Sequence, residues 1–180
     1  MSTQAATKWA IDGAHSEIGF KVKHLMITNV AGKFDKFTGS VEAEGDDFVN
    51  AKISFTAEAA SVNTGQPQRD GHLQSPDFFD VAKFPHIKFE SSKLEKVSGS
   101  RYALTGNLTV REVTKPVTLD VEFAGLAKDP YNNTKAGFEI TGKINRTDFG
   151  LNFNAPLETG GVLLGEEIKL QIDAQLIKQA

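Results

Sequence analysis

Four histidines are the residues of this chain whose side chains could bind a metal ion. They are His15, His24, His72 and His86, and none has the HxH or HExxH spacing that brings two ligands to one metal. The chain also has no cysteine that could complete such a site. We therefore predict that the protein binds no metal.

A smaller group of polar residues could instead support nucleophilic catalysis. Ser16, His72 and Asp70 have the residue types of a Ser/His/Asp triad, but such residues occur by chance in any chain of this size. The sequence has no GxSxG turn, no phosphate-binding P-loop and no GxGxxG dinucleotide motif. Hence we predict no catalytic residue and no cofactor.

The adjacent residues Arg69 and Asp70 have two interpretations. They could form a structural ion pair or cap that fastens their segment to the rest of the fold, with His72 hydrogen-bonded nearby. Alternatively, Arg69 could lie at the mouth of a cavity, where its planar guanidinium could bind the phosphate or carbonyl oxygen of a head group. Arg69 is thus the candidate for contact with a polar part of a ligand.

These polar residues lie in the one long interruption of a sequence that otherwise alternates like β-strand. The interruption spans residues 61–85 and contains Ser-Pro-Asp at 75–77, which is a typical helix start with Ser as N-cap and Pro at the first helical position. We expect a short helix from there to just before Pro85, with Phe78 and Phe79 facing an apolar interior. Because a nearly all-β chain interrupts itself only here, we expect this segment to lie at an opening.

Apolar and polar residues alternate along most of the remaining chain, as in strands with one buried face. The clearest runs are 18–22, 53–57, 102–110, 117–123, 138–144 and 168–176. Turn residues separate neighbouring runs and no βαβ spacing occurs, so the strands should form an antiparallel meander. Such strands can pack as a sandwich or close into a barrel. We favour an all-β, eight-stranded antiparallel barrel with one short helical insertion, because closure removes exposed edges.

The composition limits the partners and the cellular setting. A chain of 180 residues fits a single domain over 1–180, with a flexible N-terminus at 1–7. The net charge of −3, with both signs interspersed, predicts no nucleic-acid partner. No segment resembles a signal peptide, so we expect a cytoplasmic protein as written, or a periplasmic one if a leader was removed. Of the aromatic residues, 13 are Phe, two are Tyr and one is Trp. Because Phe has no polar atom in its ring, this bias fits either an ordinary core or a dry cavity for an apolar ligand.

Four ordered blocks of the sequence resemble the YceI-like family, also called the lipid or polyisoprenoid-binding family. They are WAIDGAHSEIGFKVKHL at 9–25, SVNTGQPQRDGHLQSPDFFDVAKFPHIKF at 61–89, LTGNLTVREVTKPVTL at 104–119 and INRTDFGLNFNAPLETGGVLLGEEIKL at 144–170. Together they cover nearly the whole chain and are far more specific than a short motif. The resemblance implies an extended, lipocalin-like barrel that encloses a long-chain amphiphile, typically a polyisoprenoid, a quinone or a fatty amide.

We expect apolar residues of the inward strand faces, of the insertion and of residues 146–166 to line the ligand cavity. Hydrophobicity alone decides which strand face points inward. The predicted lining residues are Phe20, Val22, Phe34, Phe37, Phe55, Phe78, Phe79, Phe89, Leu104, Leu108, Leu119, Phe138, Ile140, Phe149 and Leu151. The insertion and residues 146–166 are expected to close the ends of the barrel.

The resulting hypothesis is non-enzymatic binding, storage or transport of a long-chain isoprenoid or fatty lipid. The lipid would be a ligand and not a catalytic cofactor. Transient contact with a membrane through exposed lysines, and a homodimer, are further expectations. One alternative is a hydrolase or isomerase that uses His72 and Asp70 on a lipid head group. Another is a barrel that acts only as an interaction protein and whose collapsed core leaves no ligand cavity.

Overall fold

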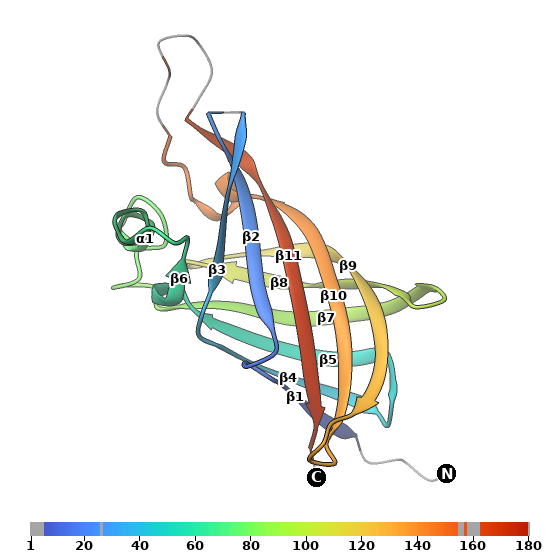
Figure 1. Ribbon diagram of the computed structural model, residues 1–180. Helices are drawn as coiled ribbons and strands as arrows, with labels where there is room; N and C mark the ends of the chain where they lie inside the picture. The colour runs from blue at the N-terminus through green and yellow to red at the C-terminus, as the bar shows by residue number, and fades with distance from the viewer. Residues whose placement is uncertain (1–5, 26, 155–156, 158–162, 180) are drawn as a thin grey trace.

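The computed structural model describes residues 6–25, 27–154, 157 and 163–179. Within them, eleven strands form one antiparallel sheet, accompanied by one short α-helix, α1 (Pro67–Gln74) (Figure 1). The strands are β1 (Thr7–Ile11), β2 (Glu17–His24), β3 (Thr28–Phe34), β4 (Phe37–Glu44), β5 (Asp47–Glu58), β6 (Val62–Asn63), β7 (His86–Ser98), β8 (Arg101–Val110), β9 (Val113–Lys128), β10 (Thr134–Asn145) and β11 (Leu164–Lys178). Two 3₁₀ turns, η1 (Ala59–Ser61) and η2 (Arg146–Phe149), complete the regular structure.

Pairing of β1 with β11 closes the sheet into a barrel. One edge of β11 serves two strands, because its last residues pair with β1 and its earlier residues pair with β2. On their other edges, β1 pairs with β4 and β2 pairs with β3. β1 continues into β2 through a bend at residues 12–16, β3 into β4 through a bend at 35–36, and β5 into β6 through η1, because β4 pairs with β5 and β3 pairs with β6. Each of these three pairs acts as one bent strand of the barrel, so the eleven strands make eight. The predicted eight-stranded antiparallel barrel is confirmed.

The alternation of the sequence decides which side chains fill the barrel. Phe55 of β5 lies opposite Phe89 of β7, and Phe89 lies opposite Leu108 of β8. One layer of apolar side chains thus runs from strand to strand around the inner face. Gly106 in β8 makes this packing possible, because a Cβ there would lie 2.5 Å from the Phe89 ring.

A cluster of aromatic residues fills one end of the barrel. Trp9 and Phe48 are 0 % and 2 % exposed, and their ring centroids lie 5.2 Å apart. The Phe48 ring meets the Phe138 ring edge-on, with centroids 5.0 Å apart. Edge-on and tilted aromatic pairs stabilise a core beyond the area that they bury. These side chains therefore close this end of the barrel.

The helix of the insertion lies earlier in the chain than predicted. It begins at Pro67 and ends at Gln74, so Ser75 follows its last turn instead of preceding its first. A residue before proline avoids the helical region, and Pro76 therefore stops the helix at Ser75, whose φ of −75° and ψ of 168° are extended. The Ser75 hydroxyl donates a hydrogen bond to the carbonyl oxygen of His72. Serine caps the end of this helix, and Pro67 provides its start.

The N-terminal boundary also needs correction. Thr7 is the first residue of β1 and pairs with Ala43 of β4, so the ordered barrel begins within the segment 1–7 that was expected to be flexible. Residues 1–5 of that segment lie outside the described residues. Among the described residues, α1 has only 8 residues, and no helix has the length and apolar character needed to cross a membrane.

Candidate functional site

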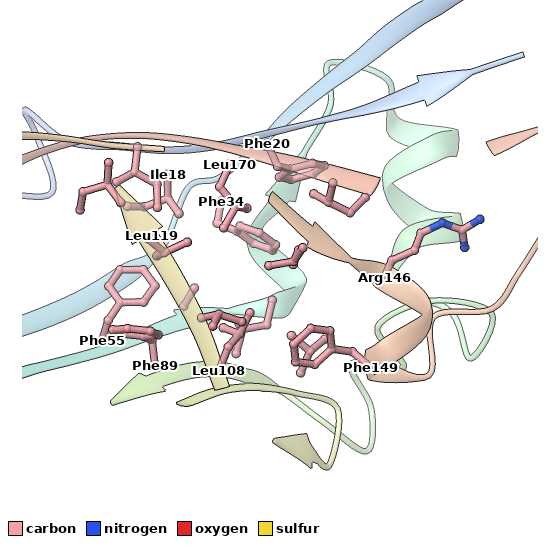
Figure 2. A pocket seen from close by; sticks show the side chains of 18 of the residues that line it. Ile18, Phe20, Phe34, Phe55, Phe89, Leu108, Leu119, Arg146, Phe149 and Leu170 are labelled. Carbon is pink, nitrogen blue, oxygen red and sulfur yellow. The ribbon is translucent and has the colours of Figure 1, made fainter. Parts of the chain in front are cut away.

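A cavity of about 670 Å³ runs along the inside of the barrel (Figure 2). Its walls are alternate residues of the strands, together with residues of the insertion and of η2. The volume falls within the range of roughly 300–1,000 Å³ that is typical of ligand sites. Within the described part of the chain, no aspartate, glutamate or lysine lines it. The cavity can therefore hold an apolar molecule of substantial length.

The structure places every predicted apolar lining residue except Phe37 at this cavity. Phe37 instead borders a separate polar hollow on the surface, beside residues 13–17. Phe37 shares its strand face with Gly39 and Val41, which do line the cavity, but it is the first residue of β4 and packs beside the buried residues Phe34 and Ala57. Its ring packs against Phe55, with centroids 6.0 Å apart.

Polar side chains gather at the end of the cavity where the insertion lies. α1 contributes Arg69 and His72 to the lining, and the segment before it contributes Thr64. Arg69 and His72 are three residues apart, which places them on one face of the helix. This end of the cavity is the mouth, and its rim carries the polar groups of the site.

Arg69 and Asp70 both hold Thr64. Arg69 donates hydrogen bonds from Nε to Thr64 Oγ1 at 2.7 Å and from Nη2 to the Thr64 carbonyl oxygen at 2.8 Å. Asp70 Oδ1 accepts hydrogen bonds from Thr64 N at 2.8 Å and from Thr64 Oγ1 at 2.6 Å. In this arrangement the two residues fix the chain that leads into α1 without forming an ion pair with each other in the described part of the chain.

The residues considered for a Ser/His/Asp set do not come together. His72 Nε2 lies 2.9 Å from Asp77 Oδ2, so its carboxylate partner is Asp77 and not Asp70. Ser16 lies at the bend between β1 and β2, where its Oγ contacts the carbonyl oxygen of Gln175. The His72 ring packs edge-on against Phe78 and Phe153, with centroid distances of 5.0 and 4.8 Å. His72 is therefore part of the wall at the mouth.

Arg146 is a second arginine at the cavity, and it is 3 % exposed. It lies just beyond Phe149 in Figure 2, at the opposite end of the view from Phe55. Its Nε donates to the carbonyl oxygen of Gly165 at 2.8 Å, and its Nη1 donates to those of Leu151 at 2.6 Å and Phe153 at 2.8 Å. These bonds hold the segment after η2 against the start of β11.

Burial lowers the pKa of the Arg146 guanidinium from its ordinary value, and the charge of Glu166 opposes this effect. An arginine remains protonated through such a shift, because its ordinary pKa lies far above neutral pH. The mouth of the cavity therefore contains a buried positive charge.

The sequence matches the family model of the YceI-like domain over residues 9–176. The chain belongs to the YceI-like family. A UPF0312 protein of Staphylococcus aureus (strain N315) is 41 % identical over 170 residues, which cover 94 % of this chain and 96 % of that protein. The crystal structure of the Campylobacter jejuni YceI protein is 34 % identical, with 100 % of each chain covered and a TM-score of 0.77.

The YceI-like barrel also superimposes on a polyisoprenoid-binding domain from Saccharophagus degradans. That comparison covers 95 % of this chain and 98 % of the domain, with a TM-score of 0.70 and 13 % sequence identity. At this level of identity the comparison establishes the common fold alone.

Sequence reasoning missed Arg146, Phe153 and His24 as lining residues of the YceI-like barrel. The signal for Arg146 was present, because it is a charged residue at the end of a strand and at the start of a long apolar stretch. Asn145 caps the η2 turn by accepting hydrogen bonds from Thr147 N and Oγ1. That cap turns the chain at Arg146, but the sequence does not tell on which side of the turn the guanidinium lies.

Proposed function

We propose that the protein binds and carries a long-chain amphiphilic lipid, with an isoprenoid tail inside the barrel, and that it does so without catalysis. The observation that carries this proposal is the continuous apolar cavity of about 670 Å³, whose wall includes Phe48 and Leu176 at the closed end and His72 and Phe153 at the mouth. A barrel of eight strands is about wide enough for one narrow ligand.

The character of the wall supports a lipid over a polar ligand. The deeper part is lined by residues such as Leu94, Leu104, Leu119, Phe138 and Leu170, which offer no hydrogen bonds from their side chains. A polar molecule would lose its hydration there without compensation. The isoprenoid nature of the tail is supported by the shared fold with the polyisoprenoid-binding domain of Saccharophagus degradans.

Two observations favour carriage over chemistry at a head group. Asp70 uses its Oδ1 to hold Thr64, and His72 pairs with Asp77 at the rim. A general base needs a nucleophile or a substrate proton within hydrogen-bond reach. The hydrogen bonds of Asp70 instead hold the insertion in its fold.

The direct test is extraction of the purified protein with denaturing solvent, followed by mass spectrometry. We expect a long-chain isoprenoid lipid in a ratio approaching one per barrel, and native mass spectrometry of the same sample should give the matching mass. Purified protein that contains no lipid and takes up none from detergent solution would contradict the proposal.

A further inference from the structure

Two rows of like charge cross the outer wall of the barrel. β10, β11 and β2 lie side by side there (Figure 1), and each row takes one residue from each strand at directly paired positions. The basic row consists of Lys143, Lys169 and Lys21. The acidic row consists of Glu139, Asp173 and Glu17, and Glu122 of β9 extends it by pairing with Glu139. All of these residues are exposed.

The charges of the two rows are not neutralised within the chain. In the part of the chain that the structure describes, no residue of either row takes part in a recorded ion pair. Like charges directly opposite each other on neighbouring strands are destabilising. A single barrel therefore gains no stability from this arrangement, whereas a molecule that presents the complementary charges would stabilise it.

A middle row of uncharged residues makes the pattern symmetric. It lies between the two charged rows and consists of Thr141, Gln171 and Gly19. In each strand the lysine lies two residues to one side of the middle row, and the carboxylate lies two residues to the other side. Residues two apart in a strand share a face. A half turn about an axis along the middle row therefore exchanges the positions of the basic and acidic rows.

We infer that two copies of this chain associate face to face through β10, β11 and β2, with the two β11 strands antiparallel. A two-fold axis along the middle row places the basic row of each copy against the acidic row of the other. Lys169 then faces Asp173 of the second copy at the centre of the contact, and the pairs of β10 and β2 flank it. Both copies use the same surface, as an isologous interface requires.

The interface is held by charge, and this sets its strength. Exposed ion pairs each contribute little, so the association should be weak and sensitive to salt. Complementary rows of charge mainly select the partner and the orientation. The contact lies on the outer wall, while Leu170 and Ile172 of the same strand line the cavity on its other side. The inference is therefore independent of what the cavity holds.

Sedimentation of the purified full-length protein at two salt concentrations is the first test. Between about 0.01 M and about 1 M salt the Debye length falls from about 30 Å to about 3 Å. We expect monomer and dimer in equilibrium at the lower concentration, and an association constant at least tenfold smaller at the higher one. Protein that stays monomeric at low salt and millimolar concentration would overturn the inference, and so would a dimer that salt does not affect.

Charge exchange within the central pair identifies the surface. Lys169→Glu and Asp173→Lys should each lower the association constant by about tenfold or more, because each changes two symmetry-related pairs. The double variant Lys169→Glu/Asp173→Lys exchanges the two charges and should restore association to within a few-fold of the wild type. Lys88→Glu is the matched control, because Lys88 is exposed on β7, away from this face. A dimer that both single variants leave intact, or that the double variant does not restore, contradicts this interface.

A cross-link tests the position of the axis. The chain has no cysteine, so Gln171→Cys introduces a single thiol, and the axis brings its two copies together. A short bismaleimide should link this variant at low salt with a yield several-fold above that of Asn107→Cys, whose cysteine would lie on the exposed face of β8. Equal yields would overturn the inference. Thermal unfolding shows whether each charge variant folds, and if one does not, the cross-link still decides the question.

Discussion

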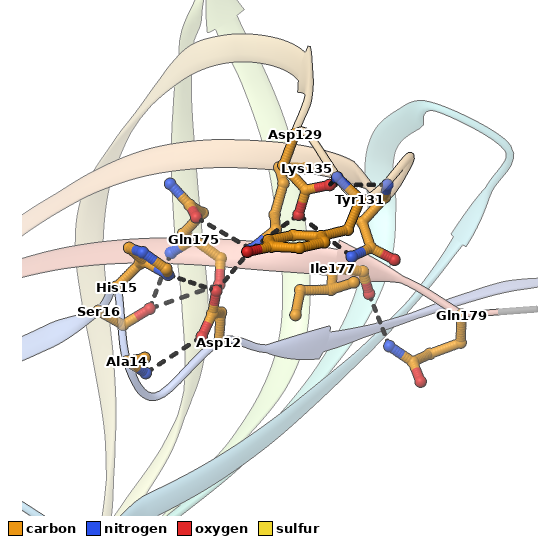
Figure 3. Close-up of polar contacts among 11 residues, drawn as sticks. Asp12, Ala14, His15, Ser16, Asp129, Tyr131, Lys135, Gln175, Ile177 and Gln179 are labelled. Carbon is orange, nitrogen blue, oxygen red and sulfur yellow. Dashed lines mark hydrogen bonds and ion pairs between the residues drawn. The ribbon is translucent and has the colours of Figure 1, made fainter.

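Lys135 Nζ lies 2.6 Å from Asp12 Oδ2 and ties the start of β10 to the bend between β1 and β2 (Figure 3). The same carboxylate oxygen lies 2.7 Å from His15 Nδ1, and the other carboxylate oxygen accepts a hydrogen bond from Ala14 N at 3.1 Å. Lys135 also donates to Gln175 Oε1 of β11 at 3.3 Å. These contacts join β10 and β11 to the bend between β1 and β2.

This contact predicts a loss of stability in acid. The hydrogen bond from Lys135, with further bonds from His15 and Ala14, lowers the pKa of Asp12 from 3.8 to about 2, against the opposing effect of burial. A carboxylate with a lowered pKa contributes its stability fully above its ordinary pKa and loses it as the pH falls toward the lowered value. We expect the free energy of unfolding to fall by about 2 kcal/mol through this group, between pH 4 and pH 2.

Urea unfolding at a series of pH values measures this effect. Asp12→Asn should lower stability at neutral pH and flatten the dependence on pH in that interval. Asp46→Asn is the control, because Asp46 pairs with Lys178 at the surface with its side chain 50 % exposed. If the free energy of unfolding of Asp12→Asn fell with pH as steeply as that of the wild type, Asp12 would not be the group responsible.

Thr64→Val should loosen the insertion without unfolding the barrel. The substitution removes the hydroxyl that accepts from Arg69 Nε and donates to Asp70 Oδ1. We expect a loss of about 1–2 kcal/mol that is confined to this segment. Hydrogen exchange of the amides in α1 should become faster by tenfold or more, while amides of β8 keep their rates. Thr38→Val, on the exposed face of β4, serves as the control.

Ala174→Phe should block the cavity. Ala174 of β11 lines the cavity opposite Phe138 of β10, so a phenyl ring there occupies space that the tail would fill. We expect the amount of extracted lipid per barrel to fall several-fold, with a stability change below about 3 kcal/mol. Ala124→Phe on the exposed face of β9 adds the same ring outside the barrel and should leave the lipid content unchanged. Equal lipid content in both variants would argue against a ligand inside the barrel.

Tail length should be discriminated only weakly once the cavity is full. Burial of each CH₂ contributes about 0.8 kcal/mol, yet non-covalent affinities saturate near roughly 20 kcal/mol. Ordering a flexible chain costs further free energy. Titration with isoprenoids of increasing length should therefore show an affinity that rises and then levels off. A sharp optimum at one length, with a steep fall on both sides, is the result that this account does not allow.

His72→Ala separates carriage from catalysis. A carrier should keep its lipid within a few-fold after this change, because the imidazole only packs against Phe78 and Phe153 and pairs with Asp77. His15→Ala, at the other end of the barrel, is the matched control. Turnover of a lipid ester by the wild-type protein that disappears in His72→Ala alone would favour the enzymatic alternative.

The strand faces could be predicted because a strand has one simple period. Phe89, Leu104 and Leu119 lie in the middle of long strands, where the alternation of polar and apolar residues leaves one choice of inner face. The period also gives the strand face of Phe37, which it shares with Gly39 and Val41, but it does not tell that the cavity ends before the first residue of β4. The end of α1 could be read from the sequence, because a residue before proline rarely continues a helix. Ser75 was nevertheless predicted to cap the start of a helix, and it caps the end of α1.

Arg69 could be expected at the mouth from its place in the insertion, but the rest of the polar rim could not be predicted, because it depends on contacts between distant segments. Arg146 lies in the cavity wall through hydrogen bonds to Leu151, Phe153 and Gly165, and the last of these requires β11 to be in place. Likewise, the partner of His72 depends on how the chain turns after α1. Sequence patterns identify faces of elements, and they do not identify which loop residues meet.

The double role of β11 has a consequence for biosynthesis. This strand pairs with β10 on one edge and with both β1 and β2 on the other, so the strands that precede it cannot form a sealed tube without it. Until the ribosome releases β11, the nascent chain exposes an open, curved sheet with apolar side chains on its concave face, a species prone to aggregation. The proposed lipid would therefore have to enter through the mouth after synthesis, or during the final closure, when it would act as a template for the last strand.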